Sequence, residues 1–170
     1  IDNKFKEERR AIRGARGEEK VGDLLSELHE GYSIIHDVVS PYGNIDHVVI
    51  GKEAGVFLLE TKAHGGKITV DGTTLLLNGH FPEKDFISQT IRNAYWLREE
   101  IGKITGEKPW ITPVLVFTNA FVPGMPPVKG ISIINKRYLL QKIKNERHPN
   151  SASKKAWEMR ETIEQRLLST

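Results

Sequence analysis

Three ionisable side chains interrupt a stretch that otherwise reads as two apolar strands around a short loop, NIDHVVIGKEAGVFLLETK at residues 44–62. They are Asp46, Glu60 and Lys62. Ionised side chains are rarely buried unless they are paired or bind a cation. The chemistry that such a trio could carry is the binding of a divalent metal ion by the two carboxylates, with the lysine acting on a phosphate group.

The spacing predicts that the three side chains meet on one face of a sheet. The loop at residues 51–55 is rich in glycine and typical of a hairpin connection. A symmetric hairpin places Asp46 opposite Glu60, with Cβ atoms about 4.5–5.5 Å apart. Lys62 then lies on the same face, about 6.6 Å further along its strand. A register shift of one residue would separate the two acids.

Two interpretations of this cluster are open. Carboxylates about 5 Å apart repel each other by about 3 kcal/mol at an effective dielectric constant of 20. Protonation of one acid, the neighbouring Lys62 or a bound cation would relieve that repulsion. An oxygen-lined site suits Mg²⁺ or Mn²⁺. The alternative is a buried Asp–Lys–Glu ion-pair network that serves only the fold.

Histidines offer a competing zinc site, which the spacing disfavours. Imidazole and carboxylate groups are good zinc ligands, but no two histidines stand at His-x-x-x-His spacing. A regular strand also points His47 to the face opposite Asp46. The chain has no cysteine, so disulfides and thiolate metal sites are excluded. The histidines considered are His36, His47, His64 and His80.

Hydrophobic periodicity and turn residues predict the elements that must position the cluster. Their order, α-β-β-β-α-β with additions, predicts an α/β fold in which helices flank a central sheet. The predicted elements are a helix from about Glu7 or Gly17 to Glu30, strands at 33–39, 45–50 and 56–62, a hairpin turning on Asp71-Gly72, a helix from 82 or 84 to 104, a strand within WITPVLVFTNA, a strand at 131–134, and helices at 136–145 and from 151 or 153 to 168.

Length and composition predict one globular domain. The 170 residues are 38% hydrophobic and 28% charged, which is ordinary for a folded domain. We expect an N-terminal extension (1–16), a core (17–120) and a C-terminal strand with helices (121–170). No apolar run approaches the ~20 residues of a membrane span, and the lack of cysteine suits the cytoplasm. Because the chain starts at Ile1 rather than Met, a signal or anchor upstream stays open.

Several segments together resemble the nuclease-related domain (NERD) family. They are GEEKVGDLL, NIDHVVIG, GVFLLETKAHGGKI and SQTIRNAYWL, between Gly17 and Leu97. The family is placed among the restriction-endonuclease-like, or PD-(D/E)XK, nucleases, whose signature is a strand Asp followed by Glu-x-Lys on the neighbouring strand. The resemblance implies the αβββαβ core of that superfamily, with a mixed central sheet, and a metal-dependent nuclease that acts on nucleic acid, on DNA rather than RNA.

The resemblance also marks two residues outside the hairpin. The family has a helical glutamate after a glycine, which here is Glu18 or Glu19. At ~100° per residue, Glu18 lies near the edge of the apolar stripe that includes Val21, whereas Glu19 points away from it. We therefore expect Glu18 to join Asp46 and Glu60 as a metal-binding acid. The match further implies that Gln89 positions the lysine or a substrate phosphate.

A basic tract near the C-terminus is a candidate contact for flanking phosphates. Residues 129–148 contain six Lys or Arg and one acid, although the net charge of the chain is only +3. Within it we expect phosphate contacts from Lys136, Arg137, Lys142 and Lys144. Three functions are open: a metal-dependent nuclease, a nucleic-acid-binding module without turnover, and a structural or interaction domain. A solvated surface is the simplest alternative for the tract.

Overall fold

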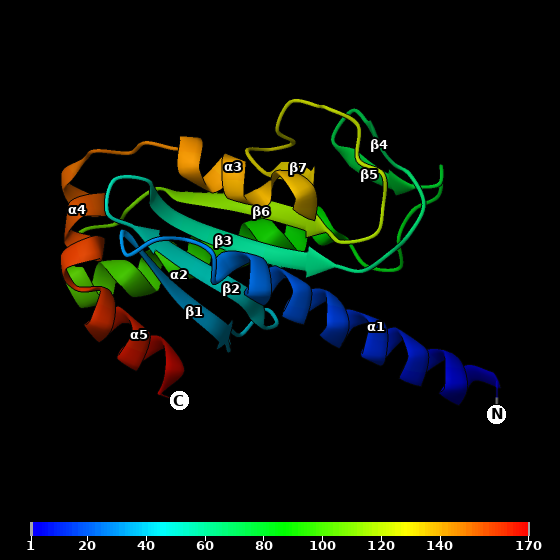
Figure 1. Ribbon diagram of the computed structural model, residues 1–170, viewed down its shortest axis with the longest axis horizontal. Coiled ribbons are helices and arrows are strands. Elements are labelled where there is room, and N and C mark those ends of the chain that lie inside the picture. The colour runs from blue at the N-terminus through cyan, green and yellow to red at the C-terminus, as the bar shows by residue number, and fades with distance from the viewer. Residues whose placement is uncertain (1, 170) are drawn as a thin grey trace.

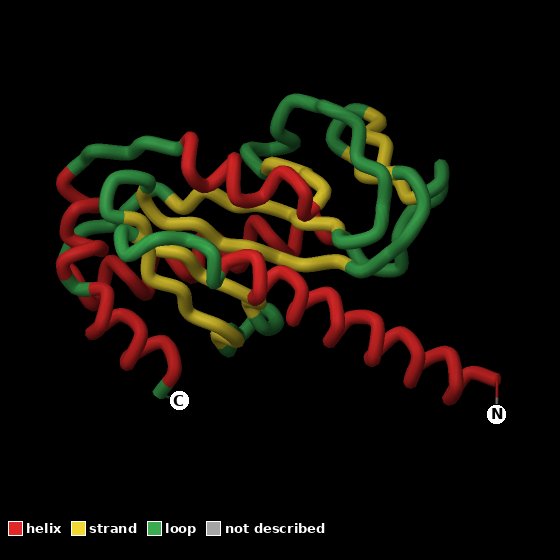
Figure 2. Tube along the Cα trace, in the orientation of Figure 1, coloured by secondary structure: helices red, strands yellow, loops and turns green. Residues whose placement is uncertain are grey.

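The computed structural model describes residues 2–169 and shows an α/β architecture (Figures 1 and 2). Within this part of the chain, no helix is both long enough and apolar enough to cross a bilayer. The elements are α1 (Asp2–Leu25), β1 (Tyr32–Val38), β2 (Ile45–Gly51), β3 (Gly55–Lys62), β4 (Ile68–Asp71), β5 (Thr74–Leu77), α2 (Phe86–Thr105), β6 (Ile111–Phe117), β7 (Ser132–Asn135), a 3₁₀ turn η1 (Lys136–Tyr138), α3 (Leu139–Asn145), α4 (Ser151–Glu158) and α5 (Arg160–Leu168).

A mixed five-stranded sheet in the order β1-β2-β3-β6-β7 forms the centre of the molecule. The β1–β2 and β2–β3 pairs are antiparallel, and the β3–β6 and β6–β7 pairs are parallel. The short β4–β5 hairpin forms a separate two-stranded sheet, inserted between β3 and α2. The predicted αβββαβ core with a mixed sheet flanked by helices is therefore confirmed, and it is compatible with a restriction-endonuclease-like fold.

Helices cover both faces of this sheet (Figure 1). On one face, Leu97 and Ile101 of α2 and Ala156 of α4 pack on alternate residues of β1–β3, and Leu167 of α5 joins this cluster. On the other face, apolar residues of α1 and α3 pack on the intervening residues of β2, β3 and β6. Because both faces are covered, the central strands are apolar along nearly their whole length. A charged residue on β3 is thus surrounded by protein.

Several predicted boundaries were wrong. Helix α1 begins at Asp2 instead of Glu7 or Gly17. Residues 4–16 are mostly Lys, Glu, Arg and Ala, which are good helix formers, and this first half of the helix projects beyond the sheet (Figure 2). The β4–β5 turn is centred one residue later than predicted, since Asp71 pairs with Thr74. The last helix is interrupted at Met159, whose φ of −99° and ψ of 18° are not helical. No glycine or proline marks that interruption in the sequence.

Candidate active site

Asp46 lies where β2 and β3 separate. The β2–β3 ladder has the predicted register and its last pair is His47 with Leu59, so Asp46 and Glu60 come next. Instead of a further ladder bond, the Thr61 N–H donates a hydrogen bond of 2.7 Å to Asp46 Oδ2. This bond fixes the Asp46 carboxylate at the open end of the hairpin.

Glu60 is almost completely buried and is held by a short chain of polar contacts. Only 3% of its surface is exposed. Asn93 Nδ2 donates to Glu60 Oε1 at 3.3 Å, and Ser40 Oγ donates to Asn93 Oδ1 at 2.6 Å. Burial, followed by the charge of Asp46, raises the pKa of Glu60 to about 8, although Lys62 and Asn93 oppose the rise. In the absence of a cation, Glu60 is therefore protonated at neutral pH.

Glu18 reaches the same acids from α1. Gly17 makes this approach possible, because a Cβ at that position would come within 3.3 Å of Ala63 Cβ. Burial, then the charges of Asp46 and Asp37, raises the pKa of Glu18 to about 7. Glu19 is exposed, as the helical geometry predicted.

Lys62 lies on the α2 side of the sheet, as Glu60 does. Its Nζ lies 4.4 Å from the centroid of the ring of Phe86, and Phe86 is the first residue of α2. The positive charge of Lys62 opposes the rise in pKa at both Glu60 and Asp46, which indicates that the ammonium group lies near the two acids. Within residues 2–169, however, Lys62 forms no ion pair within 4.0 Å. The arrangement is thus not the closed ion-pair network of the structural interpretation.

Asp37 is a further acid that the sequence analysis missed. The β1–β2 pairs on either side of it place it opposite Asp46, and its φ is 54°. Its charge contributes to the raised pKa of both Glu18 and Asp46. Aspartate tolerates the left-handed region better than most residues, and residues held in such conformations occur often at functional sites. The register of β1 with β2 is the signal that could have revealed it.

The Gln89 side chain lies near Gly43. A Cβ on Gly43 would come within 2.8 Å of Gln89 Nε2, so the amide packs against the loop that joins β1 to β2. In the described part of the chain, no hydrogen bond joins Gln89 to Asp46 or Glu60. Asn93, one turn further along α2, makes that contact instead. A direct role for Gln89 stays a prediction.

The histidines form a pair on the other side of β2. His36 Nδ1 and His47 Nδ1 are 2.8 Å apart, and the two rings lie beside Gly22 of α1. Burial and the neighbouring His36 lower the pKa of His47 to about 4. No third acidic or histidine ligand completes a metal site with them among residues 2–169. Their arrangement therefore gives no support to the zinc alternative.

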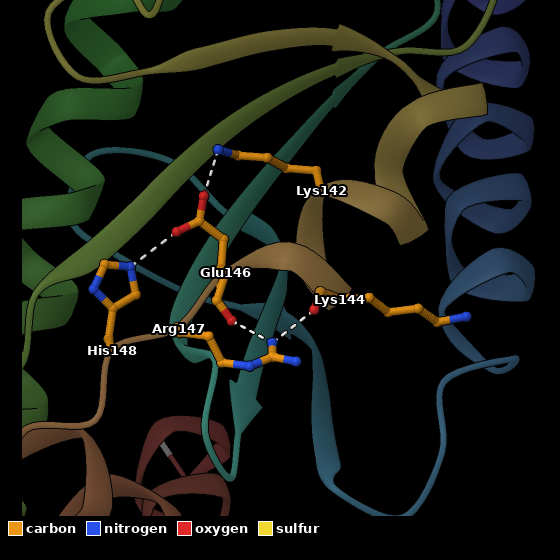
Figure 3. A network of polar contacts seen from close by, with 5 residues as sticks. All are labelled: Lys142, Lys144, Glu146, Arg147 and His148. Carbon is orange, nitrogen blue, oxygen red and sulfur yellow. Dashed lines mark hydrogen bonds and ion pairs between the residues drawn. The ribbon is translucent and has the colours of Figure 1, made fainter.

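The C-terminal basic tract is divided between two ends of the sheet. Lys136 and Arg137 follow directly after β7. Because β3, β6 and β7 are parallel, the end of β7 lies at the same edge of the sheet as Lys62, at the end of β3. Lys142 pairs with Glu146, which also contacts His148 (Figure 3). His148 N–H donates to the carbonyl of Glu53 in the β2–β3 turn, at the opposite end of β3.

In this second part of the tract, the side chains of Lys142 and Arg147 contact groups of the tract itself. Arg147 Nη1 donates to the backbone carbonyls of Lys144 and Glu146, while the Lys144 side chain points away from the network (Figure 3). Lys142 therefore serves an internal pair, and a phosphate contact is a prediction better suited to Lys136 and Arg137.

The chemistry of the acids fits a hard divalent cation. Glu18, Asp46 and Glu60 offer only oxygen donors, and each pKa is raised, which means that the cluster needs a positive charge to ionise fully. Within residues 2–169, no three such side chains converge closely enough to hold an ion as they stand. The charge of Asp46 raises the pKa of both Glu18 and Glu60. Ion binding would therefore compete with protons for these carboxylates.

Comparison with known proteins gave one family. The family model described as nuclease-related domain matches residues 13–118, more than half of the chain. This match confirms the resemblance that the sequence predicted between Gly17 and Leu97. It also extends the resemblance to residue 118, just after β6. No curated protein and no solved structure matches the chain.

Proposed function

The chain belongs to the nuclease-related domain family, and from this premise we propose that it hydrolyses phosphodiester bonds, in DNA rather than RNA, with Mg²⁺ or Mn²⁺. The observation that carries the proposal is the meeting of Asp46, Glu60 and Glu18 beside a lysine that forms no ion pair in the described chain. A purely structural cluster would be expected to pair that lysine with the acids.

Asp46, Glu60 and Glu18 would hold the ion, which supplies polarisation of the scissile phosphate and a lower pKa for a bound water. The Thr61 N–H fixes the orientation of Asp46. Asn93, itself held by Ser40, does the same for Glu60. These contacts from the backbone and a buried amide orient Asp46 and Glu60, and ion binding would draw the carboxylates closer together.

Lys62 is the residue positioned to act on the substrate. Its ammonium group offers no lone pair to a metal ion, so it donates hydrogen bonds to a phosphate oxygen or to the attacking water. The Phe86 ring holds the ammonium group by a cation–π contact and leaves its N–H groups available. The charge of Lys62 then stabilises the negative charge that develops on the phosphate oxygens. Lys136 and Arg137 would contact flanking phosphates.

Two substitutions test this mechanism. Lys62→Ala should retain Mg²⁺ binding by calorimetry, but its rate of DNA cleavage should fall by about 10²-fold or more, because the charge that stabilises the reacting phosphate is lost. Glu60→Ala should lose ion affinity and turnover together. Lys52→Ala, an exposed lysine in the β2–β3 turn, serves as the control.

Substrates for the cleavage assay are plasmid, linear duplex, single-stranded DNA and RNA, each with Mg²⁺, Mn²⁺ or EDTA. Cleavage by Lys62→Ala at the parental rate would refute the mechanism. Absence of cleavage by the parent with every substrate and ion would refute the nuclease proposal and favour a binding module.

A further inference from the structure

A second group of charges lies on α1, beside the candidate active site. A pocket of about 330 Å³, here called the α1 pocket, lies between this helix and the residues that follow β6. The basic residues in its lining recur at intervals of four, three and four, and therefore form one stripe along the helix. The lining comprises Arg9, Ile12, Arg13, Arg16, Gly17, Lys20, Thr118 and Asn119.

The helix separates charges that nearly cancel in the sequence. The first twenty residues contain seven basic and five acidic side chains. At ~100° per residue, however, the stripe spans only about 60° of the helix, and four of the five acids, Glu7, Glu8, Glu18 and Glu19, lie roughly 90° or more from its midline. The α1 pocket is thus a strongly positive surface on a chain of weak net charge.

The basic side chains of the stripe have no internal role in the described chain. Within residues 3–169, none of the four forms a salt bridge or a side-chain hydrogen bond, whereas the neighbouring Arg10 pairs with Glu83 at 3.3 Å. Like charges placed one turn apart on a helix repel one another. Four unpaired cations on one stripe are therefore better explained by an external anion than by stability.

The α1 pocket is physically joined to the candidate active site. Gly17, in its wall, directly precedes Glu18. Asn119 Nδ2 donates a hydrogen bond of 2.9 Å to the carbonyl of Ala63, the residue after Lys62. Thr118 is only 4% exposed, and its hydroxyl has no partner in the described structure. The α1 pocket is thus connected to the turn of α1 that carries Glu18 and to the residue that follows Lys62.

We propose that the α1 pocket binds backbone phosphates of the same nucleic-acid strand that is cut at Asp46 and Glu60, so the inference rests on the proposed function. Arg9 to Lys20 span about 16 Å at 1.5 Å per residue. That length corresponds to about five base-pair steps along the axis of a duplex, at ~3.4 Å each. Arginine, which provides three of the four cations, suits phosphate because its guanidinium group can donate two parallel hydrogen bonds.

Binding without turnover tests the pocket separately from catalysis. The probe is a fluorescein-labelled DNA duplex of about 20 base pairs, titrated by fluorescence anisotropy in EDTA at several salt concentrations. The test variant is Arg13→Gln/Arg16→Gln. The control variant, Lys154→Gln/Arg166→Gln, removes the same charge from exposed positions on α4 and α5. Thermal melts verify that both variants are folded.

We expect the test variant to bind about tenfold or more weakly, with a log–log salt dependence that is shallower by about one to two. The control should keep the parental slope. Parental affinity and slope in the test variant would overturn the inference, and the proposed function would stand if the parent still cuts DNA. An acidic peptide of matched charge that binds as tightly, with the same dependence on Arg13 and Arg16, would also overturn it.

Discussion

Replacing Glu60 by glutamine should remove a pH-dependent loss of stability from the metal-free protein. The pKa of Glu60 is raised from 4.5 to about 8, chiefly by burial and then by Asp46. Between these two values the folded state keeps a proton that the unfolded state has lost, so the free energy of unfolding falls as pH rises through this window. The full rise corresponds to a limit of about 5 kcal/mol. Because Glu60 and Asp46 titrate together, we expect the free energy of unfolding to fall by about 2–4 kcal/mol across this window.

Urea unfolding in EDTA at pH 5, 7 and 9 measures this loss. Glutamine keeps an oxygen that accepts the Asn93 N–H bond, so the substitution removes the charge and little else. Glu60→Gln should match the parent at pH 5 and exceed it at pH 9. Glu19→Gln, at an exposed position on α1, should follow the parental curve. Parallel pH profiles for the parent and Glu60→Gln would refute the buried-proton interpretation.

Three other perturbations address the same cluster. Millimolar Mg²⁺ should raise the melting temperature at pH 8 more than at pH 5, because protons and the ion compete for the same carboxylates. An equal rise in melting temperature at both pH values, measured against a matched salt control, would contradict this. Asn93→Ala should cost about 1–3 kcal/mol in urea unfolding, since Ser40 and Glu60 lose their partner, whereas Gln89→Ala should cost much less. Asp37→Val should lower the melting temperature and Asp37→Asn should not, because only the branched residue is strained at a φ of 54°.

The sequence predicted the hairpin well because its constraints are local. A five-residue glycine-rich loop fixes the pairing of the flanking strands, and an error of one residue would have placed Asp46 and Glu60 on opposite faces. The position of Glu18 was predictable for a similar reason. Helical periodicity ties it to Val21 and Leu25, both fully buried under the sheet.

The features that were missed depend on contacts between distant segments. Asn93 was not among the expected site residues, yet it is completely buried, and Ser40 and Glu60 satisfy its amide. Neither partner is close to it in the sequence. Asp37 lies opposite Asp46 in the register of β1 with β2, and no neighbouring glycine or asparagine indicates its left-handed φ of 54°. The α1 pocket was missed because the sequence analysis counted the charges of this segment but did not consider on which side of the helix each one lies.

The topology of β3 also has a kinetic consequence. Its partners in β2 are at most 12 residues away in sequence, whereas every β3–β6 pair is separated by 55 residues. Hairpins form in about 1–10 μs, and closing the longer loop carries the larger entropic cost. Asp46 and Glu60 are therefore brought together before α2 can supply Asn93. Their repulsion at high pH should slow folding more than it speeds unfolding, which stopped-flow measurements of both rates at pH 5 and pH 9 would detect.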